Sequence, residues 1–183
     1  MFKIFIVLFL FIVLVGISNA QETRKEITNT TTAVEDSKPN SDAVPDVYAI
    51  DGKIDQVIIL RFKYKADLLE GLKKMAKEKN IKNAVILSGI GSVINYHYHT
   101  VSNGTFPTKN IFVKNPTAPA DIASMNGYII NGKVHAHITF ADPDKAFGGH
   151  LEPETEVFTF AIVTIGILND DVDLSKVDDK NYR

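Results

Sequence analysis

The stretch that decides the fold is residues 121–140, DIASMNGYIINGKVHAHITF, in which Asn131-Gly132 separates two strand-like runs. Asn-Gly suits the type I′ turn, whose twist matches that of two antiparallel strands. The sequence therefore predicts a hairpin around this dipeptide. Side chains on a strand alternate between its faces, so His135 and His137 point one way and the apolar residues beside them point the other. This pattern is typical of a strand that buries one face and carries imidazoles on its second face.

A third histidine follows the hairpin closely. Residues 135–151 hold three of the five histidines, because this stretch ends in Gly148-Gly149-His150-Leu151. The two glycines relieve the steric limits on the backbone beside His150. We predict a loop over residues 142–153, and we expect any functional site of the protein to lie in this region.

The spacing of these histidines suggests a metal site. Two histidines at i and i+2 on one strand face can reach a single ion, and a third from a neighbouring loop would complete the three-ligand arrangement that leaves an open position on zinc. The candidate ligands are His135, His137 and His150, with Asp142 or Glu152 as a carboxylate. Neutral imidazole suits zinc, copper or nickel, and the sequence does not choose among these divalent transition metals.

His97 and His99 form a second His-x-His pair on the predicted strand 93–101. They again share one face, so they are further candidates for the site, together with Ser92, Gly148 and Gly149. The alternative interpretation is structural: the imidazoles hydrogen-bond across subunit contacts or occupy a polar strand face. The sequence favours this second interpretation, because short motif matches have a high rate of false positives.

Outside the hairpin, the sequence predicts one main amphipathic helix and several further strands. Asp67 is a suitable N-cap, apolar residues then repeat at helical spacing, and Asn80 is a suitable stop. The run 157–168 is apolar at nearly every position, so we expect a final strand that is buried on both faces. The fold class is α+β, with about seven strands in a mostly antiparallel sheet. The remaining predicted strands are 47–50, 56–62, 83–88 and a short one at 111–113.

Gly89-Ile90-Gly91-Ser92 resembles part of a nucleotide-binding loop, but a third glycine is missing and a strand follows where a helix would be required. We therefore interpret the glycines as a bend or a close approach between strands.

A serine hydrolase is an alternative interpretation. Its triad would use Ser88 or Ser92 as nucleophile, His135 or His150 as base and Asp142 as orienting residue. The Gly-x-Ser-x-Gly nucleophile elbow is missing from the sequence. The sequence therefore leaves enzymatic activity open and favours a protein that is not an enzyme.

The N-terminal segment has the pattern of an export signal. Lys3 precedes an apolar run over residues 4–15, and Ser18-Asn19-Ala20 resembles a signal-peptidase site. The run is shorter than the roughly 20 residues that a bilayer span needs, so we expect a cleaved signal peptide, no stable membrane span, and a secreted or periplasmic protein. The predicted organisation is a signal peptide at 1–20, a flexible polar linker at 21–45, a folded domain at 46–170 and a polar tail at 171–183.

Composition excludes several classes of site. The chain has no cysteine, so it has no disulfide, thiolate nucleophile or cysteine-ligated metal. Removal of residues 1–20 takes one of the 20 basic residues and none of the 22 acidic ones, which leaves 19 against 22 and a net charge of −3. A negative net charge argues against a protein that binds the phosphates of nucleic acids by electrostatic attraction.

Taken in order, the motifs Gly89-Ile90-Gly91-Ser92, Val134-His135-Ala136-His137 and Gly148-Gly149-His150-Leu151, followed by a final apolar strand, resemble the plants and prokaryotes conserved (PPC) domain. The resemblance covers roughly residues 46–168. It implies an α+β fold with a mostly antiparallel sheet, assembled as a homotrimer.

In plants the PPC domain is joined to AT-hooks that enter the DNA minor groove, while stand-alone prokaryotic members often carry a DNA-binding label by analogy. This chain has no AT-hook, and residues 152–155 stand where the family often has a glycine. We therefore expect an exported, oligomeric binding module for an unknown small ligand or protein. The alternatives are a metal-binding protein or metal-dependent enzyme and, least favoured, a DNA-binding protein.

Overall fold

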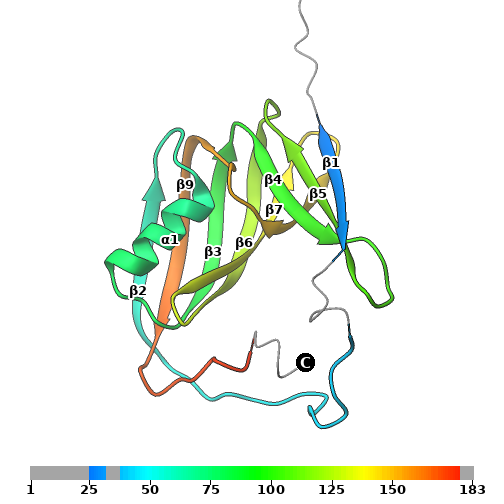
Figure 1. Ribbon diagram of the computed structural model, residues 1–183. Helices are drawn as coiled ribbons and strands as arrows, with labels where there is room; N and C mark the ends of the chain where they lie inside the picture. The colour runs from blue at the N-terminus through cyan, green and yellow to red at the C-terminus, as the bar shows by residue number, and fades with distance from the viewer. Residues whose placement is uncertain (1–24, 32–37, 178–183) are drawn as a thin grey trace, which may run out of the picture.

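The structure is a computed structural model of the 183-residue chain, and it describes residues 25–31 and 38–177. In this part of the chain nine strands form one sheet in the order β1-β5-β4-β8-β7-β6-β3-β9-β2, and every neighbouring pair is antiparallel (Figure 1). The elements are β1 (Glu26–Thr31), β2 (Ile54–Phe62), α1 (Leu68–Glu78), β3 (Ala84–Val93), β4 (Tyr96–Val101), β5 (Lys109–Asn115), β6 (Ala120–Ile130), β7 (Lys133–Ala141), β8 (Ala146–Leu151) and β9 (Val157–Leu168).

The core lies on one face of the sheet, where α1 packs against it (Figure 1). The helix begins after Asp67, whose side chain accepts a hydrogen bond from the Glu70 backbone N–H, and its buried residues recur at helical spacing. Farther along the same face, Tyr96, Phe140 and Phe147 form an aromatic cluster with ring centroids 4.9–5.7 Å apart. These contacts confirm the predicted α+β fold with one main helix.

The predicted hairpin is confirmed as β6 and β7. Asn131 and Gly132 have φ angles of +49° and +76°, as a type I′ turn requires at both central positions. Along β7 the apolar residues Ala136, Ile138 and Phe140 are buried, so the histidines between them lie on the opposite face. We call this opposite side the outer face of the sheet.

The glycines before Ser92 lie inside one continuous strand, β3, and do not form a nucleotide loop. A Cβ on Gly91 would lie 2.3 Å from the carbonyl oxygen of Phe160 on the neighbouring β9. The predicted close approach between strands is therefore confirmed. The register of β3 against β9 also shifts on both sides of this region, which marks local bulges.

Three strand predictions were wrong. Residues 47–50 form no strand, and 26–31, inside the segment predicted as a flexible linker, form β1 against β5. The loop predicted at 142–153 contains β8, which pairs with β7 on one side and β4 on the other. The described part of the sheet has nine strands, where about seven were expected.

The prediction that the final strand is buried on both faces was also wrong for the single chain. Alternate residues of β9 are buried, whereas Phe158 and Phe160 on the outer face are exposed. A run that is apolar throughout thus has one face in the core of this chain and one face uncovered.

The predicted signal peptide lies outside the described residues. In the part of the chain that the structure describes, no helix is both long enough and apolar enough to cross a membrane.

Candidate metal centre

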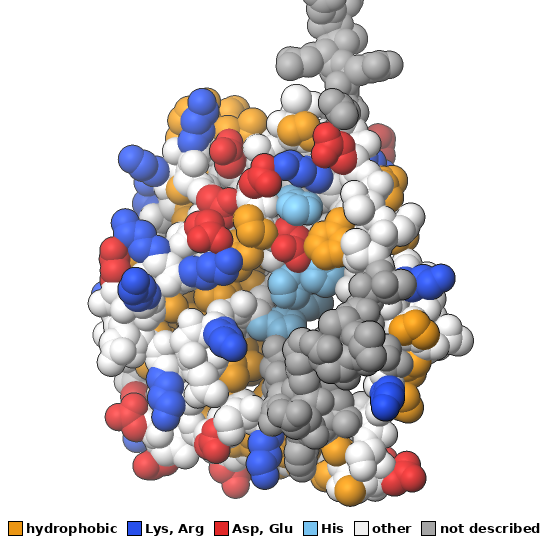
Figure 2. Space-filling view, viewed as in Figure 1, with side chains coloured by type: hydrophobic (Ala, Val, Ile, Leu, Met, Phe, Trp, Pro, Cys, Tyr) orange, Lys and Arg blue, Asp and Glu red, His pale blue; other side chains and the backbone are white. Residues whose placement is uncertain are grey.

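Four histidines converge on the outer face of the sheet from three adjacent strands. In the register, His137 of β7 lies opposite His150 of β8, and His150 lies opposite His99 of β4. Directly opposed residues of antiparallel strands project from the same face with their Cβ atoms about 5 Å apart. His135, two residues before His137, projects from the same face. Figure 2 shows histidine side chains gathered in one patch of the surface.

His150 is the centre of this histidine cluster. Its ring centroid lies 4.6 Å from that of His99, 5.0 Å from that of His135 and 5.6 Å from that of His137. The His135 and His137 rings stack with their centroids 5.5 Å apart. The predicted set His135, His137 and His150 is therefore brought into one cluster, and His99 joins it from the second predicted pair.

Glu152 supplies a carboxylate to the cluster. Its Oε1 atom lies 2.5 Å from Nδ1 of His99 and 3.3 Å from Nδ1 of His150, and its side chain is 18% exposed. The ligand atoms of His99, His150 and Glu152 all lie within 4.8 Å of one another. Nδ1 of His150 is buried and has no hydrogen-bond partner among the described residues. This nitrogen faces the Glu152 carboxylate at ion-pair distance without the geometry of a hydrogen bond, an arrangement that fits a cation bound by both groups.

The electrostatics of the cluster favour a metal-binding state. Burial lowers the pKa of His137, and the neighbouring imidazoles of His150, His135 and His99 lower it further. A lowered pKa keeps this imidazole neutral, which is the form that binds metals. For Glu152, burial alone would raise the pKa, but the interactions with His150 and His99 outweigh burial and lower the pKa to about 2. The carboxylate is therefore ionised at neutral pH.

The Glu152 shift predicts an acid-dependent loss of stability. A pKa lowered from 4.5 to about 2 stabilises the folded state above pH 4.5, and this stabilisation disappears as the pH falls from 4.5 towards 2. We expect Glu152→Gln to cost about 2–3 kcal/mol of unfolding free energy at pH 7 and nothing near pH 2. Urea unfolding of metal-free protein across this pH range measures the difference. Glu154→Gln is the control, because that carboxylate is exposed and its ion pair with Lys114 should contribute little to stability. A pH-independent cost of Glu152→Gln would contradict the assignment.

The other predicted site residues lie apart from the cluster or serve local structure. His97 is on the same strand as His99, but its Nδ1 lies 2.9 Å from the carbonyl oxygen of Pro153. Ser92 pairs with Thr159 through their hydroxyl oxygens, 2.7 Å apart. Asp142 accepts hydrogen bonds from two backbone N–H groups of the turn between β7 and β8. The contacts of Ser92 and Asp142 are thus to Thr159 and to the turn backbone.

A pocket of about 600 Å³ opens above the histidine cluster. Its floor includes all four histidines and Gly149. Gly148 and Gly149 together line a smaller adjoining pocket beside His137. The sequence did not indicate the loop residues of this pocket, Lys38, Asn40, Phe106 and Thr108, because their segments carry no chemical motif.

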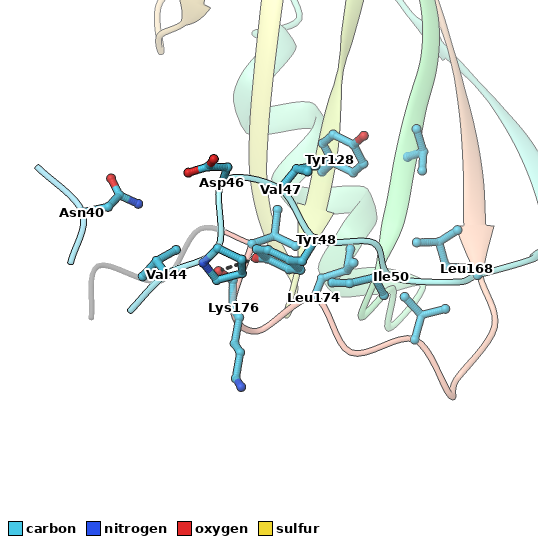
Figure 3. A pocket seen from close by; sticks show the side chains of 15 residues that line it. Asn40, Val44, Asp46, Val47, Tyr48, Ile50, Tyr128, Leu168, Leu174 and Lys176 are labelled. Atoms are coloured by element: carbon cyan, nitrogen blue, oxygen red, sulfur yellow. Dashed lines mark hydrogen bonds between the residues drawn. The ribbon is translucent and has the colours of Figure 1, made fainter. Parts of the chain in front are cut away.

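A second pocket, of about 590 Å³, lies between the segment before β2 and the segment after β9 (Figure 3). The hydroxyl of Tyr48 donates a hydrogen bond to the carbonyl oxygen of Lys176, so the two segments are joined at this point. The side chains that surround the pocket are mainly apolar, including Ile50, Leu168 and Leu174, and its described lining contains no histidine.

The sequence matches a known protein family over most of the folded domain. The family model of the Plants and Prokaryotes Conserved domain, abbreviated PCC or PPC, matches residues 49–169, more than half of the chain. The chain belongs to this family. The PPC match begins shortly before β2 and ends just after β9, so it contains α1 and eight of the nine described strands. A search of curated proteins gave no match.

Solved structures of PPC-like proteins share the fold. A plant- and prokaryote-conserved protein of Pyrococcus horikoshii is 25% identical, with a TM-score of 0.55 over 68% of this chain and 87% of its own. A metal-containing protein of Archaeoglobus fulgidus is 23% identical, with a TM-score of 0.56 over 69% and 89%. A Bacteroides thetaiotaomicron protein whose name carries a DNA-binding label is 22% identical, with a TM-score of 0.51 over 67% and 85%.

Proposed function

We propose that this PPC protein binds a divalent transition-metal ion, such as zinc, copper or nickel, at the histidine cluster. The observation that carries the proposal is the convergence of His99, His150 and Glu152, whose ligand atoms lie within 4.8 Å of one another. Two imidazoles and a carboxylate form a donor set that is common for zinc. His135 and His137 stand beside His150 and would supply further nitrogen ligands.

The arrangement would hold the ion through a rigid part of the fold. His99 and His150 are on paired strands, and Glu152 follows β8 directly, with its backbone N–H donating a hydrogen bond to the His97 carbonyl oxygen. The metal would leave a position open towards the pocket above the cluster, where it would polarise a bound oxygen ligand. The name of the Archaeoglobus relative, a metal-containing protein, supports the proposal.

The decisive experiment is metal analysis of untagged protein, because a polyhistidine tag would bind the same ions. Native mass spectrometry reports the metal content and the number of subunits together. We expect one ion per subunit after incubation with zinc and dialysis. Protein that stays free of metal under zinc, copper and nickel would overturn the proposal and leave the histidines as subunit or ligand contacts.

We further propose that the protein assembles with itself, as a homotrimer, through the outer face of β2, β3 and β9. Large apolar side chains are exposed there on all three strands, for example Ile59 at 71% and Phe160 at 39%. Apolar patches of this kind are characteristic of protein interfaces. The other apolar members of this outer apolar patch are Val57, Leu87, Ile90 and Phe158.

A charge inside this patch should break the assembly. We expect Ile59→Asp to weaken self-association by at least about 100-fold, because each subunit contact would have to bury an unpaired carboxylate. Analytical ultracentrifugation measures the subunit mass over a range of concentrations. Val47→Asp is the matched control, since Val47 is exposed and lies outside β2, β3 and β9. A monomeric wild type, or a variant that stays trimeric, would contradict the proposed interface.

Export to the periplasm or the medium is part of the proposal and rests on the predicted signal peptide at 1–20. Fractionation of cells that express the full chain tests it. DNA binding receives no support from the net charge of −3 predicted after cleavage, and we expect no salt-sensitive binding to duplex DNA.

A further inference from the structure

We infer that the pocket above the histidine cluster takes a small organic carboxylate that carries an apolar or aromatic group. The inference rests on the proposed function, because the carboxylate would occupy the open position of the metal. Three features of the pocket, its floor, its wall and its rim, specify this class of ligand. The pocket volume of about 600 Å³ is in the usual range for sites of small ligands.

The floor selects an oxygen anion. It consists of the four imidazoles, and Glu152 is not among the residues that line the pocket. A divalent ion held there would more than offset the single charge of Glu152, so the floor would be positive. A carboxylate is an organic anion that binds zinc through oxygen, as Asp and Glu side chains do.

One wall is apolar. Val101 follows His99 by two residues on β4 and projects from the same face, and Phe106 on the next loop is 50% exposed in the pocket. Adjacent exposed apolar side chains that line a pocket gain free energy when a ligand covers them. A ligand's aromatic ring packed against this wall would remove the side chains of Val101 and Phe106 from water.

The wall is held in place by its own loop. The Asn103 amide group donates hydrogen bonds to the carbonyl oxygens of Thr105 and Pro107, on both sides of Phe106. Its side-chain oxygen accepts a hydrogen bond from the Lys109 backbone N–H, where β5 begins. Asn103 is therefore a positioning residue that presents Phe106 to the pocket.

The rim of the pocket supplies hydrogen-bond donors and one cation. Lys38 is the charged residue of the described lining, and no carboxylate accompanies it there. The same lining holds polar side chains that can donate hydrogen bonds, namely Asn40, Thr108 and Asn110. A positive rim above a positive floor favours an anion, although the chain as a whole is acidic.

Three matched probes separate the contributions. Phenylacetate has the carboxylate and the ring, acetate has the carboxylate alone, and 2-phenylacetamide has the ring alone. We expect calorimetry on zinc-loaded protein to show phenylacetate binding at least about 10-fold more tightly than either of the others. Tight binding should therefore require both the aromatic ring and the carboxylate of the probe.

Variants of the wall and the rim test the placement. Phe106→Ala should weaken phenylacetate about 5-fold and leave acetate unchanged, because it removes only the ring contact. Lys38→Gln should weaken both carboxylates alike, more at low salt than at high salt, and leave 2-phenylacetamide unchanged. Lys79→Gln, an exposed lysine beyond α1, is the control and should change nothing.

The outcomes distinguish this inference from the proposed metal site. If zinc binds but phenylacetate is no tighter than acetate, or Phe106→Ala affects both alike, the ligand class is wrong and the metal site stands. If no metal binds, the proposed function fails, and the same titrations on metal-free protein decide the ligand class. There a preference for phenylacetate over both other probes, with phenylacetate binding that both variants weaken, would support the ligand class, and no preference would overturn it.

Discussion

We expect His150→Ala to abolish metal binding, with a fall in zinc affinity of at least about 100-fold. Loss of an outer-shell partner alone typically costs 10- to 100-fold, and loss of a ligand should cost more. His150 is the residue to change because its ring is next to those of His99, His135 and His137. It therefore belongs to any ligand set that the cluster can form. Native mass spectrometry and competition with a zinc chelator measure the loss.

His97→Ala is the matched control for this experiment. His97 is also on β4 and is partly buried, but its ring nitrogen faces the Pro153 carbonyl oxygen and not the cluster. Its removal should leave the zinc affinity within about 3-fold of the wild type. Circular dichroism of both variants verifies that they are folded. Equal metal content in wild type and His150→Ala would show that the ion, if bound, is held elsewhere.

The local structure around the hairpin could be predicted because each signal is contained in a few consecutive residues. Asn131-Gly132 specifies its own turn, and the alternation around His135 and His137 gives the face of each side chain. The start of α1 was equally accessible, since Asp67 caps the helix from the adjacent position. None of these features depends on a distant part of the chain.

Strand β8 could not be predicted because its sequence is unfavourable for a strand in isolation. Two glycines in a strand lower its intrinsic stability and usually mark a loop or a close backbone approach. Here Gly148 and Gly149 serve the second role, since Cβ atoms on them would overlap backbone oxygens of Ile138 on β7 and His99 on β4. The stability of β8 comes from its two neighbours, which no local pattern reveals.

The same limitation applies to the site. The sequence predicted two histidine pairs on strand faces, but not that His99 would meet His150 beside Glu152. That meeting depends on the register between β4 and β8, and β8 was interpreted as a loop. Strand alternation therefore predicts each histidine pair separately, and the long-range pairing of β4 with β8 decides how the two pairs meet.

The exposed face of β9 shows a related limit of periodicity. A run that is apolar at every position indicates burial on both faces, but it does not say which molecule provides the burial. Phe160 is uncovered in the single chain and Val163 is fully buried in it. The proposed assembly would account for both, because a second copy would cover the face that this chain leaves open.

Gly149→Ala should destabilise the folded protein by about 3 kcal/mol. The added Cβ would lie 2.2 Å from the carbonyl oxygen of His99 and 3.1 Å from its carbonyl carbon, and these atoms belong to the backbone of β4, which is paired on both sides. Neither strand can retreat without losing contact with its other neighbour. For a chain of this size the melting temperature should fall by about 6–12 °C. Differential scanning calorimetry of metal-free protein measures the change.

Gly104→Ala provides the comparison for this prediction. Apart from the glycine and its two chain neighbours, no atom of the described chain lies within 4 Å of the Cβ that it would add, so its melting temperature should stay within about 2 °C of the wild type. Gly149→Ala should also weaken zinc binding, because any separation of β4 from β8 moves His99 away from His150. If Gly149→Ala matched Gly104→Ala in stability, β8 would not be seated tightly between β4 and β7. The convergence of the histidines would then lose its structural basis, and with it the argument for a metal centre.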